Sequence, residues 1–111
     1  MDAEIDTVFK ALAAPERRLL LDRLRQESGQ TLGQLCQHMQ MTRQAVTKHL
    51  KLLEKAALVV PIWRGREKLH YLNPVPIHEI AARWIGPYEQ DRLRALADLK
   101  ANLEEETDGS V

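Results

Sequence analysis

The side chains that could recognise another molecule gather in one stretch of this chain, from Met41 to Leu58. One side of a helix through this stretch would carry long hydrogen-bond donors and cations: Arg43, Gln44, Thr47, Lys48, Lys51 and Lys55. A solvent-facing helix usually mixes both signs of charge instead. Arginine and glutamine near a helix N-terminus can read guanine and adenine edges in the DNA major groove, and lysines suit phosphates. The pattern therefore predicts a helix that recognises DNA.

The other side of the same helix is apolar. Thr42 is a good helix N-cap, and it is followed by Val46, Leu50, Leu53 and Leu58 at spacings that trace one stripe. We therefore expect a recognition helix with one side buried in the protein and one cationic side exposed.

The positive charge of the chain is concentrated around this helix. The 111 residues carry a formal net charge of zero. Residues 40 to 72 hold seven basic and two acidic residues, a net charge of +5, whereas residues 1 to 39 carry −1 and residues 73 to 111 carry −4. A positive segment in a neutral chain is typical of a surface that faces phosphates, while acids elsewhere limit nonspecific adhesion.

Two helices should come first in the chain. A helix over residues 2–13 would place Ile5, Val8, Phe9 and Leu12 on one face. A second helix is expected from Pro15 to about Glu27, because proline is well tolerated in the first turn of a helix. Its leucines predict that it is mostly buried: Leu19, Leu20, Leu21 and Leu24.

A short third helix should begin at the N-cap Thr31, and its apolar face would be Leu32, Leu35, Cys36 and Met39. A turn then leads to the cap of the recognition helix. Two helices joined by such a turn, the second one basic, match a helix-turn-helix over residues 31–57.

Residues 58–72 predict a β-hairpin, because two runs of strand-forming residues flank the turn Arg64-Gly65-Arg66. Pro61 cannot donate a ladder hydrogen bond, so its strand should lie at a sheet edge or bulge there. A basic hairpin directly after a recognition helix is the wing of a winged helix. Its two arginines could reach a phosphate or the adjacent minor groove.

The C-terminal third predicts two more helices. One would run from Ile77 to Ile85 and stop at Gly86-Pro87, and the other from Tyr88 to about Glu105. The last helix presents a long stripe of Leu93, Leu96, Leu99 and Leu103. This stripe exceeds what so small a core can cover, which favours pairing with the same helix of a second subunit. Residues 104–111 are polar and expected to fray.

The expected fold is therefore mainly α with a small β-hairpin: one winged helix-turn-helix domain over residues 1–111, with about six helices and a two-stranded wing. The helices over residues 2–13 and 88–105 would serve dimerisation. No apolar run approaches the roughly 20 residues of a membrane span, and the N-terminus is acidic where a signal peptide is basic, so a cytoplasmic protein is expected. No catalytic grouping or glycine-rich phosphate loop is present, so we expect neither an enzyme nor a cofactor.

Three segments of the sequence carry a resemblance to a known family. The opening FKALAAPERRLLLDRL, the segment TLGQLCQHMQMTRQAVTKHLKLLEKAALV and the hairpin RGREKLHYLNP are similar to the ArsR/SmtB family of bacterial winged-helix repressors, from about Phe9 to Pro74. The resemblance implies a homodimer that binds a roughly palindromic operator in double-stranded DNA and represses transcription, often of its own operon. It also implies that the first and last helices build the dimer.

Departures from the family pattern bear on regulation. Metal-sensing relatives carry Leu-Cys-x-Cys in the third helix, where this chain has Leu35-Cys36-Gln37-His38. One thiolate and one imidazole do not fill a tetrahedral zinc site, and residues two apart on a helix point about 200° away from each other. The last-helix metal pattern of other relatives, with paired histidines and acids, has no match either: His78 and Glu79 stand alone in the predicted fifth helix. We therefore expect no metal site, and regulation by a small molecule at the dimer interface or by expression level. Many relatives also have glycine where this chain has Ala57.

The predicted DNA-binding residues are Thr31, Thr42, Arg43, Gln44, Thr47, Lys48, His49, Lys51, Arg64, Arg66 and Lys68. The predicted dimer-interface residues are Ile5, Val8, Phe9, Leu93, Leu96, Leu99 and Leu103. Arg43 and Gln44 are the candidates for base readout, and the other members of the recognition helix are expected on phosphates. For His49, an interhelix hydrogen bond is an equal alternative.

Other notable side chains are expected to be structural. Cys36 should be a small buried hydrophobe, and the remaining histidines surface or packing residues: His38, His70 and His78. Core or interface packing is expected for Trp63, Trp84 and Tyr88, although Trp63 could instead line an effector pocket. The rival function is a protein-protein interaction module. Such a module would rarely keep arginines at the wing tip and cations on the exposed helix face.

Overall fold

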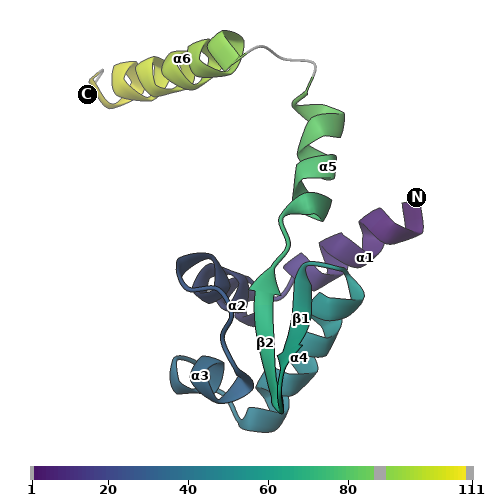
Figure 1. The fold of residues 1–111 in the computed structure, drawn as a ribbon. Helices are drawn as coiled ribbons and strands as arrows, with labels where there is room; N and C mark the ends of the chain where they lie inside the picture. The colour runs from purple at the N-terminus through teal and green to yellow at the C-terminus, as the bar shows by residue number, and fades with distance from the viewer. Residues whose placement is uncertain (1, 87–89, 110–111) are drawn as a thin grey trace. The chain divides into compact units, whose positions relative to one another are not determined.

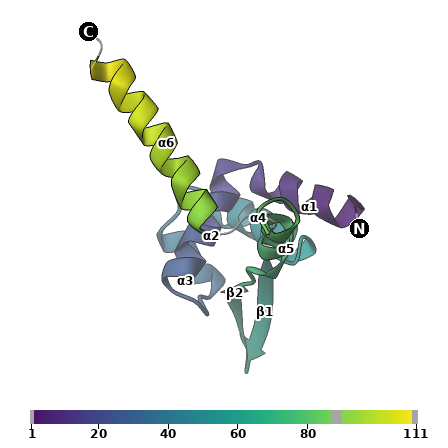
Figure 2. The ribbon, with the colours of Figure 1, turned by 90° about the horizontal axis from the view of Figure 1, so that it is seen from above.

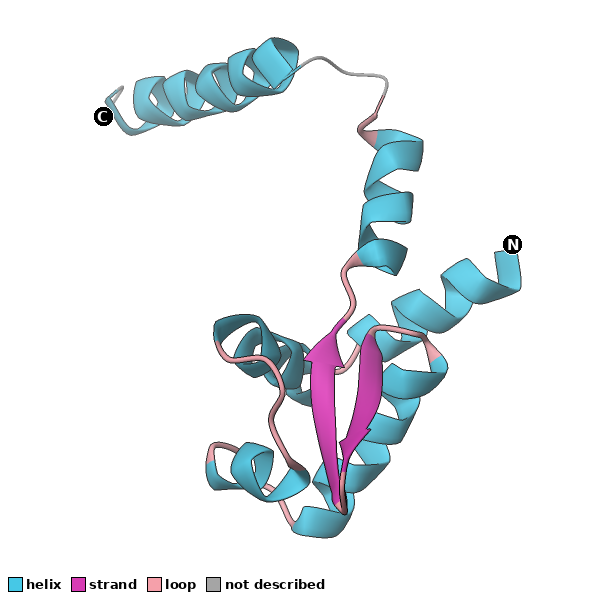
Figure 3. Cartoon of the chain, in the orientation of Figure 1, coloured by secondary structure: helices cyan, strands magenta, loops and turns pink. Residues whose placement is uncertain are grey.

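The computed structural model describes residues 2–86 and 90–109, and it divides into two compact units, residues 1–80 and 81–111. The first unit contains α1 (Asp2–Leu12), α2 (Pro15–Gln26), α3 (Leu32–Gln37), α4 (Arg43–Lys55), β1 (Val59–Arg64) and β2 (Glu67–Leu72). Helix α5 (Val75–Trp84) runs across the division, and α6 (Gln90–Gly109) lies in the second unit. The described part of the chain thus confirms the expected winged helix-turn-helix with six helices and one hairpin (Figure 1, Figure 3).

The two helices of the helix-turn-helix begin at side-chain caps. The Thr31 hydroxyl accepts from the Gln34 backbone N–H at 3.2 Å, and the Gln34 side chain accepts from the Thr31 N–H at 2.9 Å, which completes a capping box. The Thr42 hydroxyl accepts from the Ala45 N–H at 3.1 Å at the start of α4. Such caps each stabilise a helix by about 1 kcal/mol, so both helix starts are fixed by local sequence.

The core of the first unit is aliphatic. Its fully buried side chains are Leu20, Leu24, Leu35, Val46, Leu53, Leu58 and Val59. Each such side chain contributes roughly 1.5–3 kcal/mol by leaving water. Of the four leucines from which a mostly buried α2 was predicted, three are buried, but Leu19 is 53% exposed because it lies on the side of α2 turned away from the core.

Helix α4 ends earlier than predicted, at Lys55. The Leu58 N–H donates to the Leu53 carbonyl and the Ala57 N–H to the Glu54 carbonyl, both at 3.0 Å. This pair of bonds is a Schellman motif, in which one residue takes the left-handed conformation. Here that residue is Ala57, with φ of 60°. Leu58 therefore enters the core from the loop after the helix.

The wing is an antiparallel hairpin whose register pairs Val59 with Leu72 and Arg64 with Glu67. Figure 2 shows its two strands extending away from the helices of the first unit. Pro61 faces His70, whose backbone N–H and C=O bond on the other side to Gln30 and Gly29, each at 2.9 Å. Pro61 therefore occupies a position without ladder bonds on the edge strand, and the predicted edge placement is confirmed.

Helix α5 follows an anchor at Asn73. The Asn73 side chain donates to the Ala57 carbonyl at 2.8 Å and accepts from the Val75 N–H at 3.2 Å. Ile80 packs against the core of the first unit.

In the second unit, α6 extends to Gly109, four residues beyond its predicted end at about Glu105. The predicted start of this helix at Tyr88 lies outside the described residues. Of the helices that the structure describes, none is both long and apolar enough to cross a membrane.

Candidate nucleic-acid interface

The exposed side of α4 carries the predicted recognition residues. Arg43, Gln44, Lys48 and Lys51 are exposed and Thr47 is half-buried, and together these five line one shallow depression along the helix. The Thr47 hydroxyl donates to the Arg43 carbonyl at 2.9 Å, which leaves its oxygen lone pairs free to accept. This face of α4 is thus a row of donors over a buried stripe of Val46, Leu50 and Leu53.

A second concavity, which we call the α4–wing groove, lies between the start of α3, one flank of α4 and the wing. Its walls contain six predicted DNA-binding residues: Thr31, Arg43, Thr47, Lys51, Arg66 and Lys68. Trp63, Glu54, Glu67 and His70 also line it. The groove therefore brings together cations from a helix and from the wing that are 15 to 25 residues apart in the sequence.

The remaining predicted residues lie elsewhere. Gln44 and Lys48 line only the depression on α4, Thr42 is exposed at the helix start, and Arg64 is exposed at the end of β1. His49 turns away from the exposed side of α4: its Nδ1 lies 3.1 Å from a guanidinium nitrogen of Arg17. Because arginine only donates, Nδ1 accepts in this contact. Of the two expected roles for His49, the interhelix hydrogen bond is the one that the structure contains.

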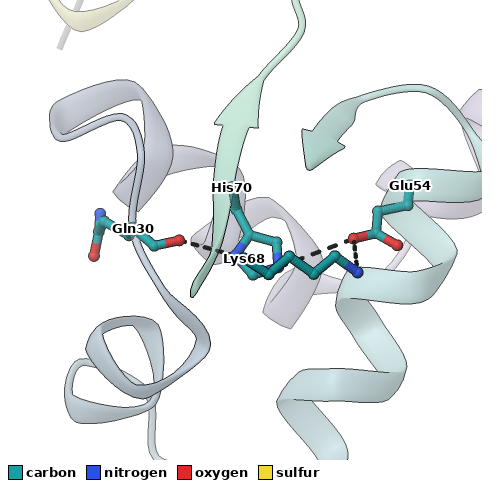
Figure 4. A network of polar contacts seen from close by, with 4 residues as sticks. All are labelled: Gln30, Glu54, Lys68 and His70. Carbon is teal, nitrogen blue, oxygen red and sulfur yellow. Dashed lines mark hydrogen bonds and ion pairs between the residues drawn. The ribbon is translucent and has the colours of Figure 1, made fainter. Parts of the chain in front are cut away.

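A polar network that includes three residues of the groove lining joins α4 to the wing (Figure 4). The Lys68 ammonium lies 2.9 Å from Glu54 Oε1, and His70 Nε2 lies 3.9 Å from the same oxygen. His70 is 3% exposed, and its Nδ1 lies 2.8 Å from the Gln30 carbonyl oxygen and donates to it. Lys68 is thus paired with a carboxylate of the recognition helix.

Sequence reasoning missed this network because Gln30, Glu54 and His70 are far apart along the chain. The available signal was Glu54 itself, one of only two acids in the basic segment. An acid on the helix opposite a lysine and a histidine of the following strand indicates an internal ion pair. The consequence is that the charge of Lys68 is compensated within the protein, whereas Lys51 and Arg66 have no ion pair among the described residues.

Two expectations about aromatic and dimer residues change. Trp63 is 65% exposed, so its predicted place in the core at the wing base is wrong. Val8 is 5% exposed and packs in the core of its own unit, which leaves it covered without a second subunit. Other members of the proposed interface are exposed: Phe9, Leu96, Leu99 and Leu103. Trp84 is also exposed, with the Arg83 guanidinium 5.8 Å from its ring centre.

Cys36 is half-buried and packs against the core, as expected for a small hydrophobe. Across residues 2–86 and 90–109, no group of three or more histidine, cysteine, aspartate or glutamate side chains is arranged to hold a metal ion.

Comparisons with known proteins agree with this geometry. A family model described as a helix-turn-helix domain matches residues 12–62. The chain is 35% identical over 91 residues to the uncharacterised HTH-type transcriptional regulator YuzN of Bacillus subtilis, covering 77% of this chain and 99% of that protein. It is 27% identical over 75 residues to the transcriptional repressor SdpR of the same organism, covering 68% and 82% of the two chains.

A solved structure has a similar fold. The ArsR-like transcriptional regulator from Rhodococcus sp. RHA1 superposes with a TM-score of 0.67 at 30% identity, covering 87% of this chain and 92% of that one.

Proposed function

We propose that this chain, which belongs to the ArsR family of DNA-binding helix-turn-helix transcriptional regulators, is a dimeric repressor that binds an inverted-repeat operator of its own or a neighbouring operon. The observation that carries the proposal is the meeting of α4 cations and the wing arginine in the α4–wing groove. A relative described as a repressor, SdpR, supports the direction of regulation.

The exposed face of α4 would enter the major groove. Gln44 and Arg43 lie in the first turn of the helix, where side chains reach base edges, and they would read sequence. Thr31, Thr42, Thr47, Lys48 and Lys51 would bind phosphates along the same strand path. Arg66 and Arg64 of the wing would contact the backbone or the adjacent minor groove.

The proposed dimer would place two recognition helices about one helical turn of DNA apart, which requires an inverted repeat. Exposed apolar side chains on α1 and α6 support this part of the proposal. Phe9 is 44% exposed, and Leu96, Leu99 and Leu103 are each more than half exposed. Ile5 and Leu93 are half-buried and would complete the two apolar faces.

Release from DNA would depend on a small molecule at the dimer interface or on the amount of the protein. No metal cofactor is needed for this function, and a cytoplasmic location follows from access to the bacterial chromosome. A protein-protein interaction module is the weaker alternative, because such a surface gains little from a row of exposed cations.

The test is selection of binding sites by the purified protein from a random duplex DNA pool, followed by affinity for the enriched duplex across a salt series. The expected result is an inverted repeat whose affinity falls steeply with salt. Failure to enrich any sequence, with only weak binding at low salt, would contradict the proposal and favour a protein partner.

A further inference from the structure

We propose that Trp63 is a further DNA-contacting residue, whose indole packs against the sugar-phosphate strand that occupies the α4–wing groove. The inference rests on the proposed DNA-binding function and adds to it an apolar, uncharged contact from the wing. It concerns a side chain for which the sequence predicted packing or a place in an effector pocket.

The exposure of Trp63 is the first observation. At 65%, it is the most exposed large hydrophobic side chain among the described residues, well above the 44% of Phe9. A buried tryptophan removes about 150–250 Å² from water, so leaving the ring exposed forgoes a substantial stabilisation. Large exposed apolar surface of this kind usually marks a contact site.

The direction of the side chain is the second observation. Successive side chains of a strand point to opposite faces, and Trp63 lies on the face of the hairpin that lines the α4–wing groove. It is paired across the strands with Lys68, which lines the same groove. The indole therefore shares a concavity with Arg43 and Lys51 of α4 and Arg66 of the wing.

The groove has the chemistry of a site for one backbone strand of DNA. A helix in the major groove and a hairpin in the neighbouring minor groove are separated by a single sugar-phosphate strand. Cations on both walls would meet its phosphates, while the indole offers an apolar surface to the deoxyribose and one N–H donor to a phosphate oxygen. Glu67 at the rim and Glu54, paired with Lys68, are the acids that line the same groove.

This role predicts a specific thermodynamic signature. A neutral side chain adds affinity without neutralising a phosphate, so its removal lowers affinity but leaves the dependence of affinity on salt unchanged. Loss of a cation such as Arg66 changes both quantities. The two kinds of contact can therefore be separated in one salt series.

The experiment uses the duplex enriched by the protein from a random pool. Affinity is measured by anisotropy of the labelled duplex for wild type and for Trp63→Ala, Trp63→Phe and Arg66→Ala. Ile62→Ala is the matched control, because Ile62 is 50% exposed on the opposite face of the same strand. Fluorescence of a Trp84→Phe variant, which retains Trp63 as its only tryptophan, reports acrylamide access to the indole with and without duplex.

We expect Trp63→Ala to lose about tenfold in affinity with an unchanged salt slope, Trp63→Phe to lose less, and Ile62→Ala to match wild type. The duplex should also shield Trp63 from acrylamide. Normal duplex binding by Trp63→Ala together with unchanged acrylamide access would overturn the inference and leave the proposed function standing. Absence of duplex binding by the wild-type protein would overturn both.

Discussion

A guanidinium nitrogen of Arg17 donates to Nδ1 of His49 across 3.1 Å, which joins the first turn of α2 to the recognition helix α4. The same arginine donates to the carbonyl of Ala11 at 2.7 Å and to that of Lys10 at 2.9 Å, at the end of α1. The Arg17 side chain of α2 thus donates to two carbonyls at the end of α1 and to His49 of α4, so it links three helices. We call these three contacts the Arg17 corner, and the placement of the recognition helix depends on them.

Arg17→Ala should therefore destabilise the protein by about 1–3 kcal/mol, because it removes donors from partly buried acceptors on two helices. Urea unfolding followed by circular dichroism measures the change. Arg25→Ala is the control, since Arg25 lies exposed on the same helix and makes no hydrogen bond or ion pair within the described residues. Equal stability of the two variants would show that the Arg17 corner contributes nothing to the free energy of unfolding.

Ala57→Gly should stabilise the protein by about 0.5–1 kcal/mol. A left-handed backbone costs an L-residue roughly 1–2 kcal/mol, and Ala57 has φ of 60°. The greater flexibility of glycine in the unfolded chain offsets part of this gain. Ala45→Gly inside α4 is the matched control and should cost about 1 kcal/mol. A loss of stability in Ala57→Gly would mean that the Schellman turn carries no such strain.

The parts of the fold that follow from local sequence could be predicted. The Thr42 cap, the buried side of α4 and the edge position of Pro61 each depend on residues close together in the chain, and the structure contains all three. The cationic face of the recognition helix could be predicted for the same reason, because a helical period places its members on one side.

The features that could not be predicted depend on contacts between residues that are far apart in the sequence. Whether Leu19 is buried depends on how α2 sits on the core, and its neighbours in the sequence do not determine this. The pairing of Lys68 with Glu54 requires the hairpin to fold back along α4. Trp63 was assigned to packing from its residue type, but strand alternation and the hairpin register place it in a groove open to solvent.

The ion pair of Lys68 predicts a difference between two lysines of the groove. Lys51 is exposed and should neutralise a phosphate, so Lys51→Ala should weaken binding to all sequences alike and lower the salt slope by about one. Lys68→Ala should change the slope less, because its ammonium already lies 2.9 Å from Glu54 Oε1. Affinity for the enriched duplex from about 50 to 200 mM salt measures both slopes. Equal slopes for the two variants would contradict the compensated charge of Lys68.

Leu99→Glu should convert the proposed dimer to a monomer and weaken operator binding, because a charge would enter an apolar interface formed by α6. Ala101→Glu is the matched control, since Ala101 lies exposed on the other side of the same helix. Sedimentation velocity gives the mass of each variant. A wild-type protein that is monomeric at micromolar concentration, or a Leu99→Glu variant that remains dimeric, would rule out this interface.

Gln44 lies in the first turn of α4, exposed and on the side of the helix that carries the cations. A side-chain amide can pair bidentately with adenine, and each such pair contributes about 1–3 kcal/mol of discrimination against the wrong base. Gln44→Ala should therefore relax base preference at one position in each half-site of the selected operator, while Lys48→Ala weakens every sequence equally. Repeating the duplex selection with both variants distinguishes the two effects. An unchanged sequence preference in Gln44→Ala would assign base readout to Arg43 and leave Gln44 as a backbone contact.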